Sequence, residues 1–131
     1  MTVIESKVII AKPATDIYSF LADLNNHQQL MPENIYNWTS TATEARFTIQ
    51  NMAKLALKIG NLIPDQEIQI VAAETPPFEL ELKWLLASTG NATEVTYQIS
   101  ADLNMMMKMI VSGPLQKLAD HETAKLAEFL K

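Results

Sequence analysis

The sequence predicts an α+β domain in which an antiparallel sheet packs against one long C-terminal helix. Three observations lead to this prediction. Residues 3–12 alternate between two faces, residues 35–103 keep a period of two, and the residues after Leu103 change to a helical period. An antiparallel sheet with one apolar face must bury that face. The amphipathic C-terminal helix is the only predicted element long enough to cover it.

The first 32 residues predict a strand followed by two short helices. Residues 3–12 form the strand, which Pro13 ends. One of its faces carries Ile4, Ser6, Val8 and Ile10. The next helix has apolar residues at positions i, i+3, i+4 and i+7, namely Ile17, Phe20, Leu21 and Leu24. Asn25 or Asn26 caps a second short helix that ends at Pro32, and we expect His27 on its solvated face.

Residues 35–103 predict six further strands separated by turns. The expected strands cover residues 35–41, 45–50, 54–59, 65–74, 78–86 and 93–103. Turns are expected at residues 60–64 and at Gly90-Asn91. In the strand over 78–86, apolar residues alternate with Glu79, Glu81 and Lys83, which should face solvent. Glu79 and Glu81 are therefore not expected to act as a paired acid and base.

The last predicted element is a helix that runs to the C-terminus. Gly113-Pro114 marks either a kink or the first turn of a new helix. A rotation of about 100° per residue gives one apolar stripe, which contains Leu115, Leu118, Ala119, Leu126, Phe129 and Leu130. Glu122 falls near its centre, where a carboxylate needs a partner, a raised pKa or a wet cavity. Tyr97 is the expected partner, whereas a shorter or rotated helix would leave Glu122 in solvent.

One face of the predicted sheet is almost wholly apolar. It collects Trp38, Phe47, Ile49, Leu57, Ile68, Ile70, Leu80, Leu82, Trp84, Val95, Tyr97 and Ile99. Arg46 has the opposite parity and should point outward. An apolar lining with few polar groups is typical of a small-molecule pocket, but a solid core has the same composition. Both interpretations stay open at this point.

Composition and charge limit the classes of partner. The chain has 131 residues, of which 48% are hydrophobic, so we expect a single domain over residues 1–131. A net charge of −5 has the wrong sign for binding nucleic acid or anionic lipid surfaces. Glu5, Lys7 and Lys12 interrupt the N-terminal segment, which therefore has neither a signal-peptide core nor a membrane span. We expect a cytoplasmic protein with no stable membrane insertion.

Motifs for metals and cofactors are not found in the sequence. Cysteine is absent, and His27 and His121 have no acidic residue at metal-ligand spacing. The three glycines, Gly60, Gly90 and Gly113, are too far apart to form a phosphate-binding loop. We therefore expect no metal and no cofactor, and the sequence predicts no particular oligomeric state.

The order of elements resembles a known superfamily. Pro13, the helix with Ile17 and Phe20, and the segments Asp23-Leu24-Asn25 and Leu30-Met31-Pro32 are similar to the opening of the START-like, or SRPBCC, helix-grip superfamily. The resemblance implies a curved antiparallel sheet of six to seven strands wrapped around the last helix, with two short helices after the first strand. It also implies a cavity that in relatives holds lipids, sterols or polyketides. The methionine-rich junction at residues 105–109 and the Gly113-Pro114 step depart from the pattern.

The leading functional expectation is binding, or binding and transport, of a small to medium hydrophobic molecule between sheet and helix. The expected ligand-binding residues are Trp84, Tyr97, Glu122, Leu82, Phe47, Trp38, Met106 and Met109. Glu122 or Tyr97 serves as the polar handle. One alternative is a cyclase or dehydratase that uses these two residues for proton transfer. The other is a protein-interaction module like the Hsp90 activators among the relatives. A single inward polar group favours binding over chemistry.

Overall fold

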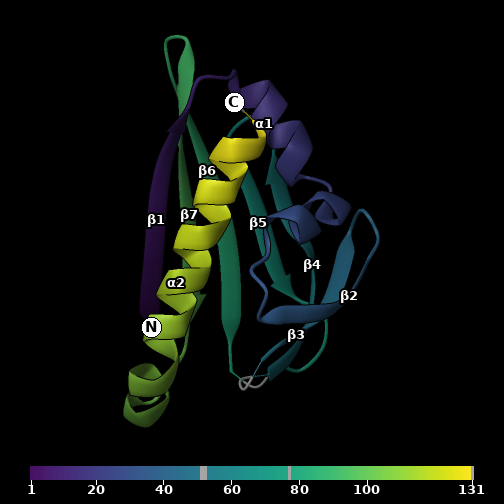
Figure 1. The fold of residues 1–131 in the computed structure, drawn as a ribbon, viewed down its shortest axis with the longest axis vertical. Coiled ribbons are helices and arrows are strands. Elements are labelled where there is room, and N and C mark those ends of the chain that lie inside the picture. Colours follow the sequence, from purple (N-terminus) through teal and green to yellow (C-terminus); the bar gives the residue numbers. More distant parts are fainter. Residues whose placement is uncertain (51–52, 77, 131) are drawn as a thin grey trace.

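The computed structural model describes residues 1–50, 53–76 and 78–130. Within them, one antiparallel sheet curls around a long helix (Figure 1). The strand order is β1-β7-β6-β5-β4-β3-β2. The strands are β1 Thr2–Ile10, β2 Ile35–Ser40, β3 Glu44–Ile49, β4 Ala53–Ile63, β5 Glu67–Ala72, β6 Leu80–Thr89 and β7 Ala92–Ala101. The helices are α1 Ala14–Leu21, the 3-10 helix η1 Leu24–Leu30, and α2 Met105–Phe129. The predicted α+β helix-grip architecture is confirmed.

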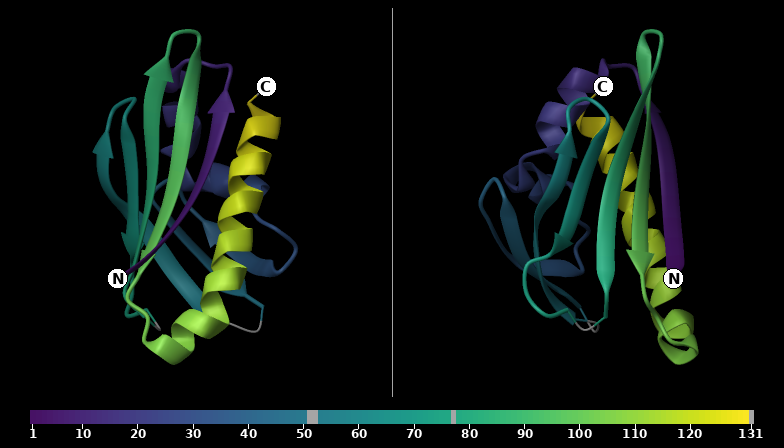
Figure 2. Two further views of the ribbon diagram at one scale, coloured as in Figure 1. Left: turned by 90° about the vertical axis from the view of Figure 1, so that its left-hand side faces the viewer. Right: turned by 180° about the vertical axis from the view of Figure 1, so that it is seen from behind.

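The first and last strands of the chain lie side by side. β1 pairs with β7 in an unbroken antiparallel register that includes Ile4 opposite Ile99 and Val8 opposite Val95. α2 follows β7 directly and returns across the concave face of the sheet, in contact with β1, β7 and η1 (Figure 2). Ile4, Ile99 and the other inward residues of the strands thereby become the core under α2.

Strand β4 is longer than predicted. It continues through Gly60 to Ile63, so the predicted turn at residues 60–64 was wrong, and the chain turns at residues 64–66 instead. The register of β4 against β5 shifts between Ile59 and Leu62, which marks Gly60 as part of a bulge. A Cβ at Gly60 would lie 2.8 Å from Oε1 of Gln69, whose side chain accepts a hydrogen bond from Asn61 N–H. The glycine therefore makes room for this cross-strand contact.

Helix α2 is continuous across the step that the sequence left open. Asn104 caps its N-terminus by accepting a hydrogen bond from Met107 N–H at 2.8 Å. Pro114 lies inside the helix and provides no N–H for the carbonyl of Ile110. Within the described residues, no helix is both long enough and apolar enough to span a membrane. The packing of the α2 stripe on the sheet thus keeps α2 helical despite the proline.

Replacement of Pro114 should stabilise the protein. Pro114→Ala restores a backbone hydrogen bond, and we expect the free energy of unfolding to rise by about 2 kcal/mol, after allowance for the freer unfolded chain. The measurement is urea-induced unfolding followed by circular dichroism. Pro13→Ala is the matched control, since Pro13 has a compatible φ of −67° before α1, and it should lower stability by about 0.5 kcal/mol. A destabilised Pro114→Ala protein would show that the proline is needed for the path of α2.

Candidate functional site

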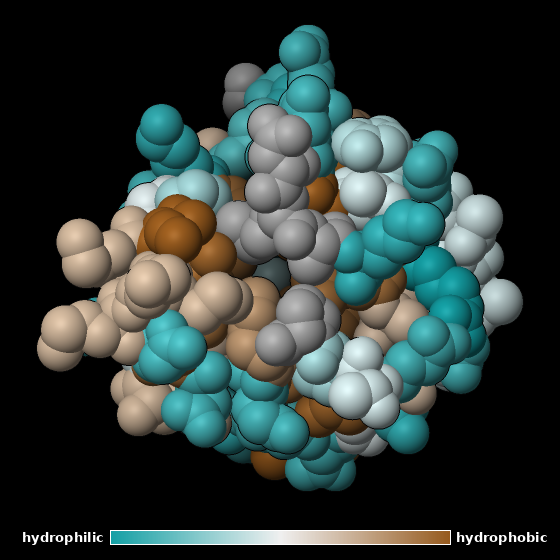
Figure 3. Space-filling model, turned by 90° about the horizontal axis from the view of Figure 1, so that it is seen from below, coloured by the Kyte–Doolittle hydropathy of each residue, from teal (hydrophilic) through white to brown (hydrophobic). Residues whose placement is uncertain are grey.

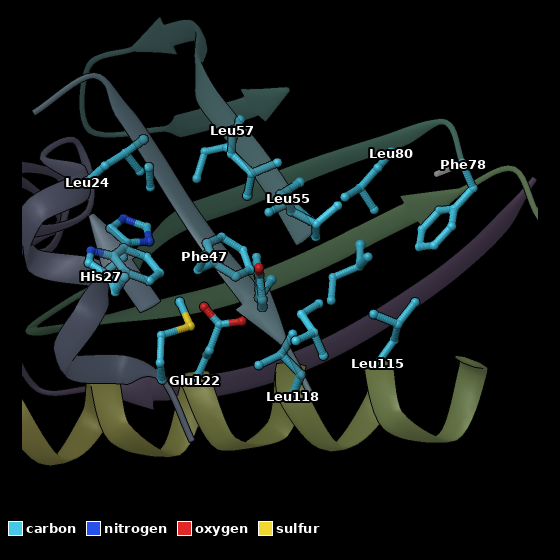
Figure 4. A pocket seen from close by; sticks show the side chains of 18 residues that line it. Leu24, His27, Phe47, Leu55, Leu57, Phe78, Leu80, Leu115, Leu118 and Glu122 are labelled. Atoms are coloured by element: carbon cyan, nitrogen blue, oxygen red, sulfur yellow. The ribbon is translucent and has the colours of Figure 1, made fainter. Parts of the chain in front are cut away.

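A narrow cavity lies between the concave face of the sheet, η1 and α2 (Figure 4). Leu24 and His27 mark one end of it, and Phe78, Leu80 and Leu115 mark the other. Its volume, taken as the space that the centre of a water molecule can reach, is about 40 Å³. That is well below the roughly 300 Å³ of the smallest drug-sized pockets.

Most of the predicted site residues meet at this cavity. Five of them line it: Trp38, Phe47, Leu82, Tyr97 and Glu122. Trp84 is fully buried behind the lining, where its ring stacks on Tyr97 with 4.0 Å between ring centroids and 12° between planes. The indole of Trp38 donates a hydrogen bond to Ser40 Oγ, whereas Nε1 of Trp84 has no partner among the described residues. Trp84 therefore supports the Tyr97 ring from behind the cavity wall.

Met106 and Met109 lie away from the cavity, contrary to the expected position. They are 72% and 82% exposed. The first turns of α2 extend past the end of the sheet (Figure 1), and about 100° per residue places both methionines roughly opposite the face that carries Glu122. Together with Met105 and Ile110 they form an exposed apolar surface, here termed the methionine patch. Figure 3 shows hydrophobic side chains gathered on this side of the lower face.

Glu122 is a buried carboxyl group. Only 1% of it is exposed, and Figure 4 shows it rising from α2 into the space beneath the sheet. Burial raises the pKa of Glu122 to about 8, although a hydrogen bond from the Tyr97 hydroxyl acts in the opposite direction. Burial and the nearby Glu122 also raise the pKa of Tyr97. At pH 7 both side chains are therefore neutral, and the Glu122 carboxyl can donate a proton to a hydrogen bond.

His27 is a cavity residue that sequence analysis placed wrongly in solvent. It is only 3% exposed, and its Nε2 lies 2.8 Å from the carbonyl oxygen of Leu21. A carbonyl only accepts, so Nε2 carries the proton and Nδ1 is left as an acceptor. Burial lowers the pKa of His27, against the effect of the Leu21 hydrogen bond. The sequence did hold a signal, because a 3-10 helix repeats every three residues and buries Leu24, His27 and Leu30 together.

The outward charged residues lie where the strand parity predicted. Arg46 is exposed and forms an ion pair with Glu74. Glu79 is exposed, and Glu81 is part-exposed with a carboxylate oxygen 3.4 Å from Nζ of Lys83. Among the described residues, no group of three His, Asp or Glu side chains is placed to hold a metal ion. The polar chemistry of the cavity therefore rests on Glu122, Tyr97 and His27.

A curled antiparallel sheet gripping a long C-terminal helix, with a cavity between them, is the START-like or helix-grip fold. No protein-family model and no curated protein matches the sequence. Solved structures do match, and the likeness extends over nearly the whole chain. A START superfamily protein from Mycobacterium smegmatis aligns with a TM-score of 0.69 at 14% identity, covering 97% of this chain and 98% of that one. The predicted resemblance is thereby confirmed for the fold.

Two further structures show the breadth of this likeness. The KanY protein aligns with a TM-score of 0.82 at 11% identity, over 98% of this chain and 97% of that one. The Aha1 dimer from Colwellia psychrerythraea aligns with a TM-score of 0.62 at 17% identity, over 98% and 99%. At such identities the likeness establishes the fold, and the function has to be argued from the site.

The burial of Glu122 predicts a specific pH dependence. Between the ordinary pKa of 4.5 and the raised value of about 8, the unfolded chain releases the proton while the folded chain keeps it. Stability is therefore lost as pH rises through this window, by roughly 5 kcal/mol in total, of which roughly 4 kcal/mol is lost by pH 8. Glu122→Gln removes the ionisable group, so the variant should match the wild type near pH 5 and exceed it by roughly 4 kcal/mol at pH 8.

Urea unfolding at a series of pH values between 5 and 8 tests this expectation. Glu128→Gln is the control, because Glu128 lies on the same helix with an exposed side chain. Its effect should be small and the same at every pH. A Glu122→Gln protein whose stability follows the wild-type pH curve would show that Glu122 is ionised and solvated in the folded state.

Proposed function

We propose that this protein binds a mostly apolar molecule and places an uncharged part of it in the cavity between α2 and the sheet. The observation that carries the proposal is the buried Glu122 carboxyl, which points into a largely apolar cavity. A buried acid costs stability compared with an apolar residue of similar size, so the core gains nothing from it. A hydrogen bond to a ligand explains why a carboxyl group occupies this position despite its cost in stability.

The chemistry of the cavity favours a neutral guest with one oxygen. Removal of apolar surface from water supplies affinity at about 25 cal/mol per Å². The Glu122 carboxyl can donate to a carbonyl or hydroxyl oxygen, and Nδ1 of His27 can accept from a hydroxyl. With Glu122 and His27 both uncharged, a buried ionic group would find no opposite charge in the lining. The cavity volume of about 40 Å³ further favours a short or narrow guest such as an alkyl chain.

Straight-chain alcohols provide the direct test. Isothermal titration calorimetry with alcohols from butanol to decanol should show saturable binding, tightening about fourfold per added methylene until the cavity is filled. Glu122→Leu should weaken alcohol binding about tenfold through loss of a hydrogen bond. Ala45→Leu should block binding, since Ala45 is a buried small residue of the lining. Met106→Ser is the control outside the cavity and should change nothing. Absence of saturable binding by any alcohol would overturn the proposal.

A second candidate function is a protein-interaction module, and the methionine patch favours it. Single exposed apolar residues are common, but a contiguous group is typical of an interface. Met105, Met106, Met109 and Ile110 lie within six consecutive positions at one end of α2. One of the structural neighbours is an Aha1 dimer, so self-association is the form of interaction to examine first.

Sedimentation velocity over a range of protein concentrations tests the second candidate. If the patch is a self-association surface, the wild type should form a concentration-dependent dimer, and a Met106→Ser, Met109→Ser double variant should stay monomeric. Lys108→Gln, an exposed change in the same turns of α2, serves as the control and should still dimerise. A wild-type protein that is monomeric throughout would exclude a homodimer through this surface.

A further inference from the structure

A second hollow adjoins the cavity on one side of α2. It has a volume of about 420 Å³ and lies between α2 and the segment that joins η1 to β2. Its lining consists of Pro32, Asn34, Pro114, Lys117, Leu118 and His121. We refer to it as the Lys117 groove. Leu118 lines both the groove and the cavity, so this one side chain contributes to the wall between them.

The groove differs from the cavity in charge. Lys117 is exposed, and no ion pair involves it within residues 1–50, 53–76 and 78–130. Nε2 of His121 is shielded from solvent and has no hydrogen-bond partner in the described part of the chain. Asn34 adds an exposed side-chain amide. The groove thus gathers an ammonium group, an imidazole nitrogen and an amide, and it has no carboxylate in its lining.

We propose that the Lys117 groove binds the carboxylate of an amphipathic ligand whose alkyl chain passes Leu118 into the cavity. This inference rests on the part of the proposed function that places an apolar chain in the cavity, and it names the ligand class, the alkyl carboxylates; Glu122 then keeps its hydrogen bond with Tyr97. The ammonium of Lys117 and the amide of Asn34 donate to the carboxylate oxygens. The chain gains from burial among the apolar residues of the cavity.

A monovalent anion fits the groove better than a phosphate group. The lining contributes a single lysine, and the protein as a whole carries a net charge of −5. A dianionic phosphate is usually held by several cationic or backbone donors, whereas one lysine balances one carboxylate. Leu118 is the one lining residue that the two hollows share, so a chain attached to that carboxylate enters the cavity where this side chain moves aside.

The test compares two ligands that differ only in their head group, decanoate and 1-decanol. Isothermal titration calorimetry at pH 8 and low salt measures both on the wild type, on Lys117→Gln and on Lys108→Gln. Lys117→Gln should weaken decanoate binding about fivefold and leave decanol binding unchanged. Lys108→Gln is the matched control, because Lys108 is an exposed lysine of α2 outside the groove, and it should affect neither ligand.

The possible outcomes separate the two proposals. If both ligands bind but Lys117→Gln weakens neither, or weakens both equally, the groove proposal is overturned and cavity binding stands. If decanol binds and decanoate does not, the carboxylate assignment is likewise wrong. If neither ligand binds the wild type, both proposals fail. Thermal unfolding of each variant confirms that the exposed lysine replacements leave the fold intact.

Discussion

The concave apolar face of the sheet has to be covered, and the core, the cavity and the burial of Glu122 all depend on how α2 covers it. The pairing of β1 with β7 places the start of α2 at the edge of the sheet and directs the helix back across it. Each large apolar side chain buried there contributes about 1.5–3 kcal/mol relative to exposure. That gain keeps α2 helical across Pro114. It also buries Glu122 at a position where a charged carboxylate is unfavourable.

The neutral state of Glu122 shapes what the cavity can recognise. The Tyr97 hydroxyl is hydrogen-bonded to the carboxyl, and the Tyr97 ring is held in turn by stacking on Trp84. His27 lies edge-on to Trp84 with 6.2 Å between ring centroids. The ring of Trp84 therefore packs against both Tyr97 and His27. A site built in this way presents hydrogen-bonding groups without net charge. Positive charge is found instead beyond Leu118, at Lys117, and the two hollows therefore differ in the head groups they suit.

Strand parity and helix periodicity predicted the fold and the centre of the site. Inward parity on β7 and the α2 stripe were enough to pair Tyr97 with Glu122, because both patterns are set by backbone geometry that a single sequence reveals. Inward parity also placed Trp84 correctly on the concave side of the sheet. It did not show that Tyr97 and His27 would cover Trp84, since depth depends on neighbours from other elements.

The errors arose where a local pattern has two physical meanings. Gly60 predicted a turn because glycine is common in turns. In the structure it lies within β4, where a larger residue would collide with the side chain of Gln69 on the neighbouring strand. A local sequence pattern does not reveal such a contact between strands. His27 was expected in solvent, but it follows the three-residue period of a 3-10 helix, which places it on the buried face with Leu24 and Leu30. Met106 and Met109 were assigned by their chemistry, although the helical angle that identified Glu122 would have placed them on the opposite face.

Because the cavity is small, the size of the ligand that it can hold depends on which part of its wall can move. The sheet is held by hydrogen-bonded pairing of neighbouring strands, and η1 is held by hydrogen bonds from His27 Nε2 to Leu21 O and from Leu24 N–H to Ala42 O. The following segment contains Pro32, which has no N–H to donate, and it borders the groove. Partial exposure of Leu118 leaves that side chain freer to change rotamer than the fully buried lining. Movement of Leu118 would therefore connect the apolar cavity to the side of the molecule where Lys117 lies.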